Sequence, residues 1–145
     1  MARRRPKIAV PFVIDASLTA SWHFEDERSA AAEAVLDCLE HDAAYAPLIW
    51  WFEIRNVIAL GERRKRATQE DTAEFVAFLS QLPIGLDSLP DDERVMVLAR
   101  KHGLTFYDAA YLELAQREGV PLATLDKELV TAARAEGVPL VLAAP

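Results

Sequence analysis

The sequence predicts an α/β fold in which a central parallel sheet of about five strands is flanked by helices. Short apolar runs alternate with longer segments of helical periodicity, which is the pattern of βαβ units. Gly103, Gly119 and Gly137 fall just past three expected helices, and Thr68 and Pro90 stand where two others begin. At 145 residues, 52% of them hydrophobic, the chain is long enough to bury a core of its own.

The expected elements follow from these patterns. Strands are predicted over residues 12–15, 43–46, 84–87, 122–124 and 140–142. Helices are predicted over residues 17–24, 27–41, 49–64, 69–82, 91–102, 106–118 and 127–136. Two sets of residues spaced i, i+3, i+4 and i+7 are expected to face the core: Phe75, Phe78, Leu79 and Leu82, and Val95, Leu98, Ala99 and His102.

No repeat, low-complexity stretch or linker divides the chain, so we expect a single domain over residues 1–145. Residues 1–7 resemble the start of a secretory signal, but Pro11 interrupts the apolar segment and Asp15 closes it, which favours a basic arm. No apolar run approaches the roughly 18 residues of a membrane span, so we expect a cytoplasmic protein. The lone Cys38 has no disulfide partner and is expected to be a core thiol.

The charge balance at first argues against a nucleic-acid partner, because 16 basic and 23 acidic residues give a formal net charge of −7. The basic residues are nevertheless clustered, at residues 3–7 and again at 63–66. Such runs are either solvated helix ends and tails or a path for RNA.

Several kinds of chemistry lack support. Only five Gly are present, without a phosphate-binding loop or dinucleotide fingerprint. His23, His41 and His102 have no metal-ligand spacing, and no Ser occupies a nucleophile-elbow context. Catalysis through carboxylates therefore remains.

Four carboxylates occupy notable positions: Asp15, Glu53, Asp108 and Asp126. The pattern of apolar residues singles out Asp15, Asp126 and Glu53. Asp15 and Asp126 each end an apolar run, so they are expected at the carboxyl ends of strands, where open α/β sheets bind ligands. Glu53 and Asn56 share a predicted helical face with Ile49, Phe52 and Leu60, which would aim a carboxylate and an amide inward. An ionised group there is costly unless a cation or several donors compensate it.

Each acid also has a structural explanation. Asp15 and Asp126 can be helix N-caps, and Thr105 with Asp108 resembles a capping box in which Asp replaces Glu. Glu53 can be a partly exposed residue on a misjudged helix face. The hydroxyls of Ser17 and Thr124, each two residues from a strand-end Asp, can belong to turns or caps.

The residues resemble those of the PIN-domain nucleases, and within them the VapC-type toxins of bacterial toxin–antitoxin pairs. Four blocks carry the resemblance, in order and over most of the chain. They are Val13-Ile14-Asp15-Ala16-Ser17, Pro47 followed by Glu53-Ile54-Arg55-Asn56, the block from Thr105-Phe106-Tyr107-Asp108 to Ala115, and Leu122-Ala123-Thr124-Leu125-Asp126. The basic arm is not part of the family pattern.

The resemblance implies a specific site and specific partners. Asp15, Glu53, Asp108 and Asp126 would ligate one or two Mg²⁺ or Mn²⁺ ions, which prefer oxygen ligands. Ser17 and Thr124 would be hydroxyl partners of the cluster, and Asn56 would support it. It further implies an RNA substrate cut by metal-activated water, a homodimer, and a small VapB-type antitoxin that covers the acidic site.

Two other functions compete with a toxin ribonuclease. A PIN-type module that binds RNA or a partner without cutting would not need converging carboxylates. A signalling receiver domain would need an acidic pair at the end of the first strand, where Ala16 and Ser17 follow the single Asp15. Finally, the large aromatics Trp22, Trp50, Trp51 and Phe52 either pack in the core or line a groove for an antitoxin helix.

Overall fold

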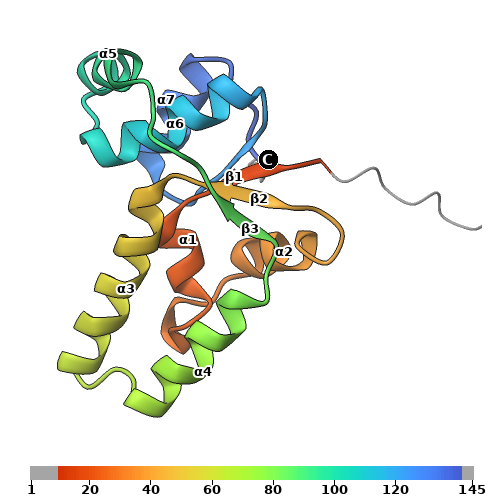
Figure 1. Ribbon diagram of the computed structural model, residues 1–145, viewed down its shortest axis with the longest axis vertical. Helices are drawn as coiled ribbons and strands as arrows, with labels where there is room; N and C mark the ends of the chain where they lie inside the picture. The colour runs from red at the N-terminus through yellow and green to blue at the C-terminus, as the bar shows by residue number, and fades with distance from the viewer. Residues whose placement is uncertain (1–9, 142–145) are drawn as a thin grey trace, which may run out of the picture.

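The computed structural model describes residues 10–141, and within them a four-stranded parallel sheet has helices on both faces (Figure 1). The strands are β1 (Phe12–Ile14), β2 (Ala44–Ala46), β3 (Ile84–Leu86) and β4 (Leu122–Ala123), in the order β3-β2-β1-β4. Central β1 pairs Val13 with Tyr45 of β2 and with Leu122 of β4. The predicted α/β class with a parallel sheet is confirmed, with one strand fewer than expected.

The strand expected over residues 140–142 is reduced to a single bridge between Leu140 and Leu122, and residue 142 lies outside the described residues. The Leu122 N–H donates to the Pro139 carbonyl at 2.9 Å, and the Val141 N–H donates to the Leu122 carbonyl at 3.0 Å. Pro139 has no N–H of its own to pair. Within the described residues, the pairing of this segment with β4 is limited to the bridge at Leu140.

Seven α-helices are present in the described chain, and Figure 1 shows α5, α6 and α7 on one side of the sheet and the others on the opposite side. Their bounds are α1 (Ala16–Ser21), α2 (Ala30–Cys38), α3 (Leu48–Arg63), α4 (Gln69–Ser80), α5 (Asp92–His102), α6 (Phe106–Glu118) and α7 (Lys127–Ala135). The expected helix over 27–41 begins later, at Ala30, because the Ser29 hydroxyl accepts the Ala32 N–H at 3.1 Å and caps it. Before it lies a 3₁₀ turn, η1 (Glu25–Glu27).

Most of the residues predicted to face the core do so. Val95 and Leu98 are fully buried, and Phe75 and Leu79 are buried. The prediction was wrong for Phe78, whose side chain is 38% exposed because it borders a surface groove. Cys38 is half-buried and packs against the core cluster.

Within residues 10–141 no helix has both the length and the apolar character needed to cross a membrane. The expected basic arm, residues 1–7, lies outside the described residues.

Candidate active site

Asp15 follows the last residue of β1 and is the N-cap of α1, so both local explanations of its position hold at once. One carboxylate oxygen accepts the Leu18 N–H at 2.9 Å, and the Ser17 hydroxyl donates to the other at 3.1 Å. The Thr124 hydroxyl, from the end of β4, also donates to this carboxylate. The side chain is thus fixed by three donors although the residue is only 4% exposed.

Burial raises the pKa of Asp15 from its ordinary 3.8 to about 6, and the negative charge of Asp126 adds to the rise. The hydrogen bonds from Thr124, Leu18 and Ser17 act in the opposite direction but do not outweigh burial. The carboxylate is therefore held in a defined orientation at the cost of keeping its charge away from water.

Thr124 connects Asp15 to the second strand-end acid. Its hydroxyl donates to Asp15 and accepts the Asp126 N–H at 3.0 Å. Asp126 caps α7 by accepting the Leu129 N–H at 2.9 Å, as the structural explanation expected. Because β1 and β4 are neighbours in the sheet, the turn after β4 places Asp126 beside Asp15.

Glu53 lies on α3 and is half-buried. The buried residues of this helix include Trp50, Ile54 and Ile58, so Glu53 stands at the flank of the buried face. Burial raises the pKa of Glu53, and the charges of Asp108 and Asp15 raise it further.

The predicted inward stripe around Glu53 was wrong for two members, because Phe52 is 62% exposed and Asn56 is also exposed. The sixteen residues of α3 carry apolar side chains around most of the helix, so the spacing alone did not identify the buried face.

Asp108 lies in the first turn of α6 and is half-buried. Thr105 caps this helix through its hydroxyl, which accepts the Asp108 N–H at 3.0 Å. The reciprocal bond of a capping box is found at α4 but not here, which leaves the Asp108 carboxylate available. Burial raises the pKa of Asp108, and Asp126 contributes to the rise.

The four acids therefore interact electrostatically although they come from four separate parts of the chain. The charge of Asp126 raises the pKa values of Asp15 and Asp108, and the charges of Asp108 and Asp15 raise the pKa of Glu53. We call Asp15, Glu53, Asp108 and Asp126 the acid cluster. Ser17 and Thr124 join it through Asp15, whereas the Asn56 side chain makes no hydrogen bond within the described residues.

The chemistry of the acid cluster fits a hard divalent cation. Its ligands are all oxygen, and none of the four acids has a salt-bridge partner among the described residues. Over residues 10–141, no three acidic, His or Cys side chains lie close enough together to form a ready-made metal site.

The histidines take no part in the acid cluster. His23 stacks on Phe75 with ring centroids 4.5 Å apart, and His102 lies 2.7 Å from Glu136. His41 is exposed.

Sequence reasoning missed Tyr111, whose hydroxyl donates to Glu53 at 2.9 Å. It also missed Thr19, which accepts the Trp50 indole N–H at 3.0 Å and donates to the Asp15 carbonyl at 2.8 Å. The available signal for Tyr111 was its place three residues after Asp108, on the same helical face.

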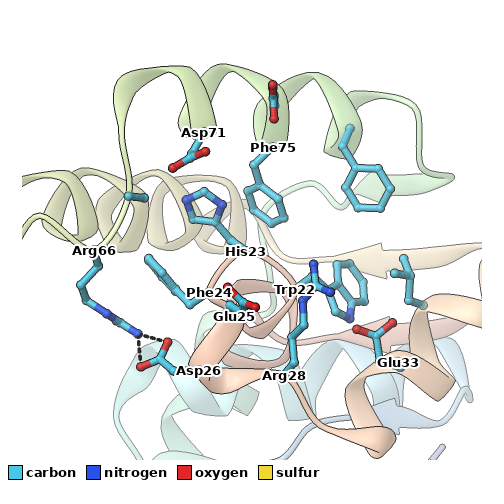
Figure 2. Close-up of a pocket in the computed structure, with 14 residues that line it drawn as sticks. Trp22, His23, Phe24, Glu25, Asp26, Arg28, Glu33, Arg66, Asp71 and Phe75 are labelled. Carbon is cyan, nitrogen blue, oxygen red and sulfur yellow. Dashed lines mark hydrogen bonds and ion pairs between the residues drawn. The ribbon is translucent and has the colours of Figure 1, made fainter.

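A separate groove of about 960 Å³ lies between α4 and the segment from the end of α1 to α2 (Figure 2). Its apolar wall includes Trp22, Phe24 and Phe75, and Arg66 crosses one end, stacked on Phe24 and paired with Asp26 at 2.8 Å. None of the acid cluster lines it. The remaining lining residues are His23, Glu25, Arg28, Glu33, Leu36, Ala67, Asp71, Glu74 and Phe78.

Comparison with known proteins identifies the family. The sequence model of the PIN domain matches residues 12–135, which include all four acids of the cluster. The chain therefore belongs to the PIN domain family, as its sequence motifs predicted.

Its relatives include ribonuclease VapC3 of Pyrobaculum aerophilum, 34% identical over 125 residues that cover 81% of this chain and 90% of that protein. Three solved structures share the fold. PAE2754 of Pyrobaculum aerophilum has a TM-score of 0.63 at 24% identity, covering 86% of each chain. FitAcB of Neisseria gonorrhoeae has a TM-score of 0.61 at 19% sequence identity, and the match covers 89% of this chain and 95% of that one. A toxin–antitoxin complex from Klebsiella pneumoniae has a TM-score of 0.55 at 18% sequence identity, and the match covers 79% of this chain and 86% of that one.

Proposed function

We propose that this protein is a metal-dependent endoribonuclease and the toxin of a toxin–antitoxin pair, with residues 1–145 as one cytoplasmic domain. The observation that carries the proposal is the electrostatic interaction among Asp15 and Asp126, which follow β1 and β4, Glu53 of α3 and Asp108 of α6. The kinship with a ribonuclease supports RNA as the substrate.

Asp15, Glu53, Asp108 and Asp126 would hold Mg²⁺ or Mn²⁺. When bound, such an ion neutralises charge on the scissile phosphate and makes water a better nucleophile. Ser17, Thr124 and the Leu18 N–H hold the Asp15 carboxylate in a fixed orientation. Glu53 and Asp108 are half-buried carboxylates with fewer hydrogen-bond donors than Asp15, so either would be free to accept the proton that the attacking water loses.

Cleavage of RNA by the purified chain tests this function. We expect activity with Mg²⁺ or Mn²⁺, none in excess chelator, and none for Asp15→Asn, Glu53→Gln or Asp108→Asn. Asp91→Asn is the matched control, because Asp91 caps α5 as Asp15 caps α1 but lies outside the acid cluster. RNA that is bound but left intact with either metal would favour the non-cleaving module instead.

We propose that the groove between α2 and α4 receives an antitoxin helix. Apolar Trp22, Phe24 and Phe75 line it together with five acidic and two basic side chains, so the helix would present apolar anchors flanked by basic residues. Trp22 lines this groove, whereas Trp50 is buried in the core.

Co-purification with the small protein encoded beside the gene tests the groove. Phe78→Lys at its edge should prevent capture, and Leu89→Lys, at an 80% exposed position outside it, should not. Capture of the neighbour by both variants would place the antitoxin elsewhere.

We propose that a second copy of the chain covers α3, giving the expected homodimer. Trp51 and Phe52 stack edge to face with centroids 5.1 Å apart and are 41% and 62% exposed. Light scattering should report a dimer for the wild type and a monomer for Trp51→Glu. A monomeric wild type would refute this.

We propose that RNA follows α3 away from the acid cluster. Arg63, Arg64 and Lys65 are exposed at its end, about 15 Å along the helix from Glu53, whereas Arg66 is paired with Asp26 and Glu27. Replacing the three exposed residues by Gln should weaken RNA binding and its salt dependence. An unchanged affinity would show that these residues only solvate the helix end.

A further inference from the structure

The hydroxyl of Tyr111 lies where the helices that carry the acids meet. Tyr111 is 1% exposed, and its hydroxyl donates to Glu53 at 2.9 Å. Burial and the charge of Glu53 raise the pKa of Tyr111 far above its usual range.

This hydroxyl joins three elements. Tyr111 and Asp108 are three residues apart on α6, so they share a face of that helix. Glu53 belongs to α3. The backbone amide of Ala16, the residue after Asp15, also interacts with the phenol oxygen and opposes the rise of its pKa. One side chain thus contacts α3, α6 and the start of α1.

Glu53 depends on this contact more than Asp15 depends on any one of its donors. Asp15 has three donors, but Tyr111 is the one hydrogen-bond partner of the Glu53 side chain within the described residues. The charges of Asp108 and Asp15 repel Glu53, and a free Glu side chain gains rotamer entropy by turning toward water. Without the phenol, nothing in the described chain holds this carboxylate near the other acids.

We propose that Tyr111 is the positioning residue of the acid cluster, which acts by holding the Glu53 carboxylate within reach of a cation shared with Asp108 and Asp15. The proposal rests on the metal-binding role of the acid cluster proposed above. It goes beyond that role because Tyr111 itself would not touch the ion. Outer partners of metal ligands typically contribute about 10- to 100-fold in metal affinity.

Titration calorimetry of the full chain with Mn²⁺ tests the proposal. Tyr111→Phe should weaken Mn²⁺ binding about tenfold, since it removes only the hydroxyl. Tyr107→Phe is the matched control, because Tyr107 is an exposed tyrosine on the same helix beside Asp108. The Mn²⁺ affinity of this variant should equal that of the wild type. Wild-type affinity in Tyr111→Phe would overturn the proposal.

A double-mutant cycle distinguishes positioning from general packing. In a Glu53→Ala background, Tyr111→Phe should cause little further loss of Mn²⁺ affinity. A tenfold loss in both backgrounds would mean that Tyr111 acts through the fold and not through Glu53, which overturns the proposal. Glu53→Asp supplies an independent variant with an intact core: the shorter side chain keeps its charge but falls short of Tyr111, and it should lose as much affinity as Tyr111→Phe.

Urea unfolding of the metal-free variants separates this inference from the proposed function. If the contact holds Glu53, the unfolding midpoints of Tyr111→Phe and Glu53→Ala should be non-additive in the double variant. Additive midpoints would overturn the contact itself. A wild type that binds neither Mn²⁺ nor Mg²⁺ would overturn the metal site while the non-additive cycle still reported the contact.

Discussion

Replacing the most buried acid of the cluster should stabilise the metal-free protein while destroying its function. Asp15 has a folded-state pKa of about 6 against 3.8 in its ordinary state, so the folded protein binds its proton more tightly than the unfolded chain does. The stability that this proton contributes is fully present below about pH 4 and is lost as the pH rises through about 6. At pH 7.5 the folded protein carries a buried charge that costs about 3 kcal/mol.

Asp15→Asn removes that cost and retains most of the local structure. Asn caps helices as well as Asp does, so the bond from the Leu18 N–H survives. The other carboxylate oxygen, which accepts the Thr124 hydroxyl, is replaced by an NH2 group that cannot accept it, so this hydrogen bond is lost at a cost of about 1 kcal/mol, whereas Ser17 can still donate to the remaining oxygen. We therefore expect a net gain of roughly 2 kcal/mol at pH 7.5.

Urea unfolding followed by circular dichroism, in chelator at pH 4 and pH 7.5, measures this effect. The wild type should lose stability between the two pH values, and Asp15→Asn should lose less. Added Mg²⁺ should stabilise the wild type and leave the variant unchanged. A metal-free Asp15→Asn protein that is less stable than the wild type at pH 7.5 would refute the reasoning, since it would mean that the ionised carboxylate stabilises the fold.

Three further predictions concern the products, the caps and the groove. Cleavage should leave 5′-phosphate and 3′-hydroxyl ends, because no histidine joins the acid cluster to support a cyclic intermediate. The 5′ ends should then be labelled only after phosphatase treatment, and labelling without it would reveal the free 5′-hydroxyls that a cyclic-phosphate route leaves. Asp126→Ala and Asp91→Ala should each lose about 1 kcal/mol of stability through their caps, but only Asp126→Ala should also lose cleavage rate; equal rates would leave Asp126 as a cap alone. Gly61→Ala would place a Cβ 2.7 Å from the Phe24 ring, so thermal melts should show a loss of about 1 to 3 kcal/mol and antitoxin capture should weaken; an unchanged melt would mean that Phe24 moves freely.

The sheet-end acids could be predicted because their signal is local. An apolar run that ends in Asp specifies both a strand and the end at which the side chain lies, and this held for Asp15 and Asp126. The same locality explains the helix starts, where Thr68 and Asp91 cap α4 and α5 close to the expected positions. Family motifs added Asp108, which periodicity alone assigned to a cap.

The parts that sequence could not supply depend on contacts between distant segments. The bond from Tyr111 to Glu53 joins residues 58 positions apart, and the bond from Thr124 to Asp15 joins residues 109 apart. No local pattern encodes such a distance. The face of α3 is a related case, because its apolar residues surround the helix and only packing against α1 decided that Phe52 and Asn56 would be exposed.

The fold treats its other buried acids differently from those of the cluster. The Glu113 side chain is 2% exposed and pairs with Arg117 at 2.7 Å, and the Glu136 side chain is 7% exposed and pairs with Lys101 at 2.7 Å. Asp15 is as buried, yet its donors are two hydroxyls and an amide, and its pKa rises, whereas Lys101 and His102 lower the pKa of Glu136 to about 2. Basic side chains thus neutralise buried carboxylates elsewhere in the described chain, while the charge of the acid cluster is left uncompensated. Because uncompensated buried charge is costly, its retention at one place favours a role that needs an exchangeable cation there.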